Sequence, residues 1–259
     1  MIGLVQPQSR VLYDGSNINL VSNATAGAWT AWTQIVASSN EFDGVILQVS
    51  WCGSSSCYNL FEIGIGGAGA EVPVVEGVLH HYQQHGGSRG QQQSYFWPIR
   101  IPAGSRISIR RRCDLASKEG YVRLGRIRNG RPVGVGVESY GVVTGSPFGT
   151  AVTSSGTAGA YGSRVTLGVT SRRIRQISLS VAGSAASGWV DWELSLGASG
   201  SEVPILAPDA TGTTMGDSLV SPILFGPFDQ DIPAGTRISV RHAYQYSSAQ
   251  LYYAAQGVY

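Results

Sequence analysis

The sequence predicts an all-β protein made of two tandem, homologous β-sandwich domains of the jelly-roll type. Short runs of β-branched and aromatic residues alternate with clusters of Gly, Ser and Pro, and no window shows the 3.6-residue apolar period of an amphipathic helix. A ten-residue phrase occurs twice, as IPAGSRISIR at residues 101–110 and as IPAGTRISVR at residues 232–241. The 35 glycines and the 13% of charged residues are typical of a fold with many turns.

The strands of the first copy follow from these runs. They are expected at residues 45–49, 61–65, 95–101 and 106–110. In the last of them Ile107 and Ile109 alternate with polar residues and should face a core.

The repeated phrase also predicts a turn. Proline presets φ at the first turn position, and glycine accepts the left-handed conformation that closes the loop, so Pro102 and Gly104 are its structural residues. Pro233 and Gly235 repeat the pattern. The phrase therefore predicts a three-residue hairpin loop followed by a strand in both copies.

The repeat extends upstream of the phrase in the same register. FEIGIG at residues 61–66 aligns with WELSLG at 192–197, and the Glu-Val-Pro at 71–73 aligns with the one at 202–204. A period this long is the size of a domain and exceeds that of a solenoid repeat. Asn129-Gly130 and Pro132 break any strand between the copies. We therefore expect a first domain at residues 1–130, a linker at 131–138 and a second domain at 139–259.

Composition limits the possible partners and locations. A net charge of +2 argues against non-specific binding of nucleic acid. The chain has no run of about 18 apolar residues, so no membrane span is expected. The start MIGLVQPQSR lacks the basic and apolar regions of a signal peptide, so no signal peptide is expected.

Three cysteines are too few for a disulfide scaffold. Cys52 and Cys57 flank an expected hairpin tip, and a disulfide between them requires Cα atoms within about 7 Å. The second copy has no cysteine there, so the fold does not depend on this bond. No cofactor is expected.

Two segments are candidates for contact with a ligand or partner. The first is the histidine-rich loop with His80, His81, Tyr82 and His85, which the second copy replaces by TGTTMGDS. Divergent loops on a repeated scaffold are where binding tends to reside. His81 and His85 have a spacing that would suit zinc on a helix, but no third ligand is evident, so no metal is expected.

The second candidate is the arginine run Arg110, Arg111 and Arg112, whose charge would suit an acidic surface. The alternative interpretation of this run is a solvated strand face, because strands commonly direct charged residues outward.

Two serine motifs are catalytic candidates. Residues 86–90 satisfy G-x-S-x-G around Ser88, and residues 216–219 read GDSL around Ser218. A nucleophile elbow around Ser88 needs a preceding strand and a following helix, and its polar flanks do not provide them. The GDSL string lies near the end of the chain, and the only later histidine, His242, has Ser239 where the Asp of an Asp-x-x-His should be. Glu62 and Glu193 are equivalent residues expected to face outward from separate domains. The sequence therefore predicts no enzymatic activity.

The Ile-Pro-Ala-Gly-Ser/Thr-Arg-Ile phrase, the preceding Glu-Val-Pro and the Gly/Ser-rich β body resemble small virion proteins of tailed bacteriophages and gene transfer agents. The resemblance covers residues 61–110 and 192–241. It implies a non-enzymatic structural component of the virion that decorates the capsid or sits on the tail or fibres, with other virion proteins as partners.

Two further expectations accompany this resemblance. The apolar, aromatic ends of the chain predict docking surfaces and a homo-oligomer, for which a trimer with pseudo-sixfold packing is one arrangement. The alternative function is a lectin-like module that binds host polysaccharide through aromatic rings. These rings are those of Trp29, Trp32, Tyr82, Tyr95 and Trp97. An esterase, the third alternative, rests only on the two serine motifs.

Overall fold

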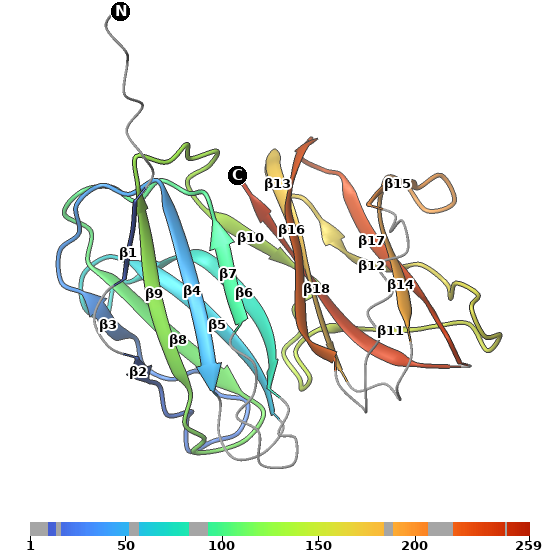
Figure 1. The fold of residues 1–259 in the computed structure, drawn as a ribbon, viewed down its shortest axis with the longest axis horizontal. Helices are drawn as coiled ribbons and strands as arrows, with labels where there is room; N and C mark the ends of the chain where they lie inside the picture. Colours follow the sequence, from blue (N-terminus) through green and yellow to red (C-terminus); the bar gives the residue numbers. More distant parts are fainter. Residues whose placement is uncertain are drawn as a thin grey trace, which may run out of the picture.

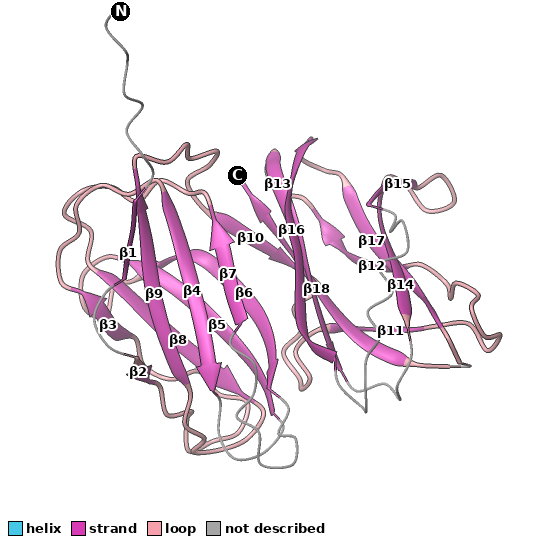
Figure 2. Cartoon of the chain, in the orientation of Figure 1, coloured by secondary structure: helices cyan, strands magenta, loops and turns pink. Residues whose placement is uncertain are grey.

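The all-β prediction is confirmed by a computed structural model of the chain (Figures 1 and 2). The structure describes residues 10–13, 17–51, 57–82, 93–183, 189–206, 220–246 and 248–259. Every regular element in these ranges is a strand. Over the same ranges no helix is long and apolar enough to cross a membrane.

The first domain is a sandwich of two antiparallel sheets. One sheet has the order β1 (Arg10–Tyr13), β9 (Tyr121–Arg128), β4 (Gly44–Trp51) and β7 (Gln93–Trp97), with β2 (Ile18–Asn19) also paired to β9. The facing strands have the order β6 (Val72–Tyr82), β5 (Cys57–Ile65), β8 (Ile107–Cys113) and β3 (Thr33–Val36).

The second domain repeats this arrangement strand by strand. One layer has the order β16 (Val220–Ile232), β13 (Ile174–Gly183), β18 (Gln250–Val258) and β10 (Val137–Tyr140), with β11 (Thr150–Thr153) also on β18. The other has the order β12 (Val165–Val169), β17 (Arg237–Tyr244), β14 (Val190–Leu196) and β15 (Val203–Leu206). β4 lies between β7 and β9 as β13 lies between β16 and β18, and β10 on β18 corresponds to β1 on β9. The tandem, homologous sandwiches are confirmed.

Each sandwich encloses an apolar core because alternate residues of its strands point inward. On β4 the inward residues Val45, Leu47 and Val49 are buried, and on β8 Ile107 and Ile109 are buried with them. A separate cluster fills the second sandwich around the inward residues of β13, β14, β17 and β18.

The repeated phrase forms the same loop in both domains. Gly104 and Gly235 have φ of +78° and +81°, and their amides donate to the carbonyls of Ser39 and Thr170 at 2.7 Å in each case. The hairpin interpretation is wrong, because the strands before and after the loop belong to opposite sheets. The loop therefore connects the two layers of a sandwich, and its glycine permits the reversal.

The two sandwiches share one continuous nine-stranded sheet, because β10 pairs antiparallel with β18 and parallel with β6 (Figure 1). The expected linker at 131–138 runs into β10 and is hydrogen-bonded on both sides. The amide of Val133 donates to Pro98 O at 2.8 Å, and that of Val135 donates to Tyr259 O at 2.7 Å. At Gly134 a Cβ would lie 2.3 Å from the Tyr259 carbonyl oxygen, so only glycine fits this crossing.

Candidate functional site: the interdomain joint and the outer sheet faces

The two domains meet through an apolar cluster, which we call the interdomain joint. Its members are Leu60 and Leu79 of the first domain with Phe148, Ala182 and Ala254 of the second, all fully buried. Leu60 and Leu79 are on the outer face of their sheet, where strand residues usually meet solvent. The joint therefore packs one sandwich against the other.

Polar contacts surround the interdomain joint. The Arg112 guanidinium lies 4.9 Å from the centroid of the Phe148 ring and donates to the Thr144 carbonyl. His81 is stacked on Tyr58 at 4.2 Å, and Tyr58 meets Tyr252 edge-on at 5.7 Å. Arg112 and His81, two of the predicted contact residues, thus lie beside the second domain of the same chain.

Three other predicted contact residues point inward, which corrects the expectation that they contact an external partner. Arg111 is fully buried, and Tyr82 and His80 are buried beside it on the inner face. Arg111 shares the inward face of β8 with Ile107 and Ile109 because side chains two residues apart point the same way. The charged triplet therefore alternates in and out and forms neither a continuous basic surface nor a solvated face.

The buried guanidinium of Arg111 is held by neutral acceptors. Its Nε donates to Asn59 Oδ1 at 2.9 Å, and its Nη1 donates to the carbonyls of Leu20 and Lys118, each at 2.7 Å. Hydrogen bonds of this kind are needed to offset the desolvation of a buried charge. This cation is thus part of the first core.

His80 lies in the same interior. Its Nδ1 is 3.0 Å from Tyr95 Oη. Burial is the main reason that the pKa of His80 falls to about 3, and the positive charges of His81 and Arg111 lower it further. The ring is therefore neutral at physiological pH.

Two cysteines approach one another at the edge of this interior. The sulfurs of Cys57 and Cys113 and a carboxylate oxygen of Asp114 all lie within 4.8 Å of one another. A hydrogen bond with Cys57 lowers the pKa of Cys113 to about 7 against the opposing effect of burial, with further lowering from the Leu115 amide and Arg111. A structural zinc site takes four ligands. The described residues offer three, and they lie near the positively charged Arg111. Cys52, the expected disulfide partner of Cys57, lies outside the described residues.

Arg110 lies on the outer face of the first domain. Its Nε donates to Glu62 Oε2 at 2.7 Å, and its guanidinium lies 4.7 Å from the Trp29 ring and 4.5 Å from the Trp32 ring. Cation–π contacts of this kind hold the side chain in place. The two tryptophans are half-buried, and the arginine occupies a face of each ring.

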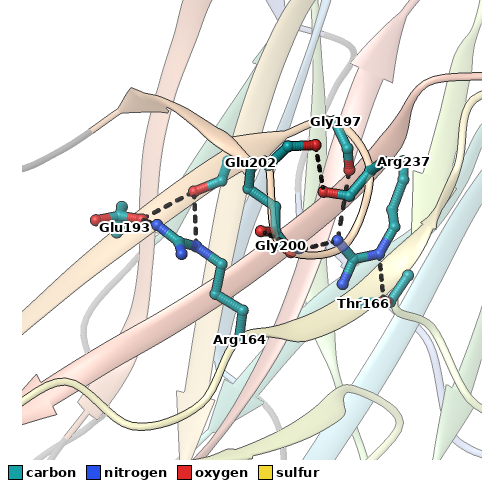
Figure 3. Close-up of polar contacts among 10 residues, drawn as sticks. Arg164, Thr166, Glu193, Gly197, Gly200, Glu202 and Arg237 are labelled. Atoms are coloured by element: carbon teal, nitrogen blue, oxygen red, sulfur yellow. Dashed lines mark hydrogen bonds and ion pairs between the residues drawn. The ribbon is translucent and has the colours of Figure 1, made fainter.

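An ion pair that occurs in both domains explains why the ten-residue phrase and the Glu-Val-Pro segment are both repeated. In the second domain Arg237 Nη1 donates to Glu202 Oε1 at 2.7 Å and its Nε to Thr166 Oγ1 at 2.8 Å, while Glu202 Oε2 accepts the Gly200 amide at 2.9 Å (Figure 3). The hydrogen bond from Arg237 is the main reason that the pKa of Glu202 is lowered.

The first domain contains the same unit. Arg106 pairs with Glu71 and donates from Nε to Gln34 Oε1 at 2.8 Å, and Glu71 accepts the Gly69 amide at 2.9 Å. Sequence reasoning did not identify this pair, although the arginine and the glutamate recur at the same spacing in both copies.

We call the ion pairs on the outer faces the arginine–glutamate ladder: Arg106–Glu71 and Arg110–Glu62 in the first domain, Arg237–Glu202 and Arg241–Glu193 in the second. The second pair differs between the domains. Glu193, the equivalent of Glu62, binds Arg164 (Figure 3) and also Arg241. Arg241 lies over the Tyr161 ring at 4.7 Å. Burial acts to raise the pKa of Glu193, but the hydrogen bonds from Arg241, Arg164 and Ser195 outweigh it and lower the pKa. The Glu193 carboxylate is thus held ionised in its ion pairs.

Several predicted residues fall outside the described ranges. They are His85, Cys52, Ser88 and Ser218. The expected turn residues Pro102, Gly104, Pro233 and Gly235 lie in the loops described above.

No protein-family model matches the chain, and no curated protein matches it in sequence. Solved structures do match. PNGase F, a glycosylasparaginase from Flavobacterium meningosepticum, is 9% identical with a TM-score of 0.38, over 97% of this chain and 96% of that chain. A peptide-N(4)-(N-acetyl-β-D-glucosaminyl)asparagine amidase is 11% identical with a TM-score of 0.36, over 93% and 96%. The tandem CBM22-1–CBM22-2 domain of Paenibacillus barcinonensis Xyn10C is 10% identical with a TM-score of 0.26, over 96% and 93%.

This comparison corrects one sequence-based expectation. The first two similar structures are enzymes by name, so the prediction that the chain has no enzymatic activity is contradicted and is not retained. The identities of 9% and 11% concern the fold alone, and they transfer no catalytic residue or substrate to this chain.

Proposed function

We propose that the chain is a structural component of a tailed-bacteriophage or gene-transfer-agent particle, in which it packs beside other virion proteins. The observation that supports this most is the interdomain joint, through which two sandwiches form one body with buried apolar contacts. A rigid unit with defined outer faces suits a protein that works by packing.

The outer faces support the same proposal. Each carries an arginine–glutamate ladder in which the side chains are fixed by ion pairs, hydrogen bonds and aromatic rings. Fixed polar side chains lose little rotamer freedom when a neighbouring protein covers them, which lowers the entropic cost of assembly.

Purification of particles on a density gradient tests this function. The chain is expected to migrate with intact particles at a fixed copy number and to remain after a high-salt wash. A chain that stays in the soluble fraction while other virion proteins migrate would overturn the proposal. Omitting the other particle proteins from the expression strain gives the matched control.

One observation favours polysaccharide binding as a second candidate. A shallow depression in the second domain is lined by Ala151, Thr153, Ser154, Ser155, Tyr161, Gly162, Ser163 and Val165. Its hydroxyl groups and the 37% exposed ring of Tyr161 suit a sugar. Tyr161→Ala should abolish retention on host polysaccharide, with Tyr246→Ala, also on an exposed tyrosine, as control. Equal retention of parent and Tyr161→Ala would reject this site.

A further inference from the structure

The outer face of the second domain's β16-β13-β18-β10 sheet is covered by the first domain. β6 lies against β13, β16 and β18. The outward residues of that sheet are consequently buried, although most are small or polar. They are Ser178, Ser180, Ala182, Ala254 and Gln256.

Among the described residues, no second sheet covers the equivalent face of the first domain. We call it the open face and define it by Val11, Tyr13, Ile46, Arg123 and Ile127. Val11 is 43% exposed and Tyr13 is 38% exposed, and the other three side chains are half-buried. Exposed apolar residues gathered on one sheet face mark a place where another protein packs.

The strand pairing shows which residues of the open face correspond to the covered one. β10 joins β6 through the bridge of Val137 with Val75 and through Ser139 Oγ, which donates to the Glu76 carbonyl. Val137 and Ser139 face Val258 and Gln256 of β18.

Val11 and Tyr13 occupy the same places on β1. They face Ile127 and Gly125 of β9, which are equivalent to Val258 and Gln256. The two most exposed apolar residues of the open face are therefore the counterparts of the two β10 residues that contact β6.

The counterpart of β6 is β15, the end strand of its sheet among the described residues. The register of the strands also gives a charge pair. Leu60 and Ala254 of the interdomain joint correspond to Asp191 and Arg123, which carry opposite charges. The Arg123 guanidinium lies 4.4 Å from the Tyr13 ring, and its buried Nε has no hydrogen-bond acceptor among the described residues.

From these observations we infer that chains associate head to tail. The β14–β15 side of one copy's second domain packs on the open face of the next copy's first domain and repeats the interdomain joint between molecules. The contact is heterologous, so it generates a closed ring if the rotation closes and a filament if it does not. The inference deepens the proposed structural function by naming a second copy as the partner, and it rests on that function.

Sedimentation of the full chain at tens of micromolar tests the contact. The parent should form oligomers. Arg123→Asp and Asp191→Arg should each weaken association about tenfold, because each places like charges opposite one another. Val11→Asp should weaken it further. Arg100→Asp makes the same charge change at the exposed Arg100–Glu41 pair and should leave association unchanged.

A mixture of Arg123→Asp and Asp191→Arg chains provides the decisive arm. Each contact between the two kinds of chain then pairs one arginine with one aspartate, whereas each contact between chains of one kind pairs like charges. Restored association supports the head-to-tail pairing, and a mixture that stays as weak as either variant overturns it. A parent that is monomeric also overturns it. Unchanged melting temperatures show that the variants fold. A parent that associates in this way but is absent from purified particles retains the contact and rejects the virion function.

Discussion

The two domains have corresponding strands and the same turn in the repeated phrase, and one inward position shows how their cores differ. β8 places Arg111 opposite Phe61, and β17 places His242 opposite Trp192, the equivalent of Phe61. Arg111 takes three neutral acceptors, whereas His242 Nε2 lies 3.2 Å from the Ala249 carbonyl oxygen. The same fold therefore tolerates a cation or a neutral ring when each is given matching acceptors.

The domains also differ on the outer face of the layer that holds β4 in one and β13 in the other. The second domain has Ala182 and Ala254 there and buries them against the first domain. The first has Val11, Tyr13 and Arg123, which remain accessible. Small residues allow the close approach of two sheets within a chain, and larger ones offer anchors to a separate molecule.

The largest expected effect comes from removing the buried cation. Arg111→Met should lower the free energy of unfolding by about 3 kcal/mol, because Asn59 Oδ1 and two carbonyls then lose a donor inside the core. Urea unfolding followed by tryptophan fluorescence measures the loss. His242→Met, which strands one carbonyl, should cost about 1 kcal/mol. Equal losses for the two variants would contradict the difference between the cores.

A smaller effect is expected at the repeated loop. Gly104→Val and Gly235→Val place a β-branched residue at φ of +78° and +81°, where an added Cβ meets no atom within 4 Å. The cost is therefore backbone strain alone, on the order of 1 to 3 kcal/mol and equal in both domains. Thermal melting checks it, with Ala103→Val, at the neighbouring exposed position, as the nearly neutral control. Parent-like melting of both glycine variants would refute the left-handed turn.

Much of this fold could be predicted because its signals are local or repeated. The alternation around Ile107 and Ile109 and the second copy of the phrase identify strands and domains directly. The inward direction of Arg111 follows from the same alternation, but its charge favoured a surface interpretation. The acceptors that make burial tolerable come from distant segments, and a sequence does not show them.

The candidate site was harder to predict for a related reason. Arg106 and Glu71 are far apart in the chain, and they meet only because β8 and the loop before β6 lie on one face. The burial of Leu60 depends on the neighbouring domain, which its outward position on β5 does not indicate. Sequence patterns describe each sandwich well, but they carry little information on what covers it.

The smallest effect separates the two interiors by their response to acid. Burial is the main reason that the pKa of His80 falls to about 3 and that of His242 to about 4 in the folded chain. In the unfolded chain each ring titrates near its ordinary value of about 6.5. Below that pH the unfolded state binds more protons, so the free energy of unfolding falls as the pH falls toward the folded pKa values.

At pH 5.5 protonation of each ring in the unfolded state should lower the free energy of unfolding by about 1 kcal/mol relative to pH 7.5. This pH lies above the range in which the paired carboxylates take up protons. Urea unfolding at the two pH values measures the loss. His80→Gln and His242→Gln should each remove about 1 kcal/mol of the loss, because glutamine does not titrate. The double variant should retain the part that comes from the Cys113 thiol, whose pKa folding lowers to about 7. A parent with the same unfolding free energy at both pH values would show that the two rings are not held neutral by burial. A loss that only His80→Gln reduces would confine the effect to the interior that also holds Arg111.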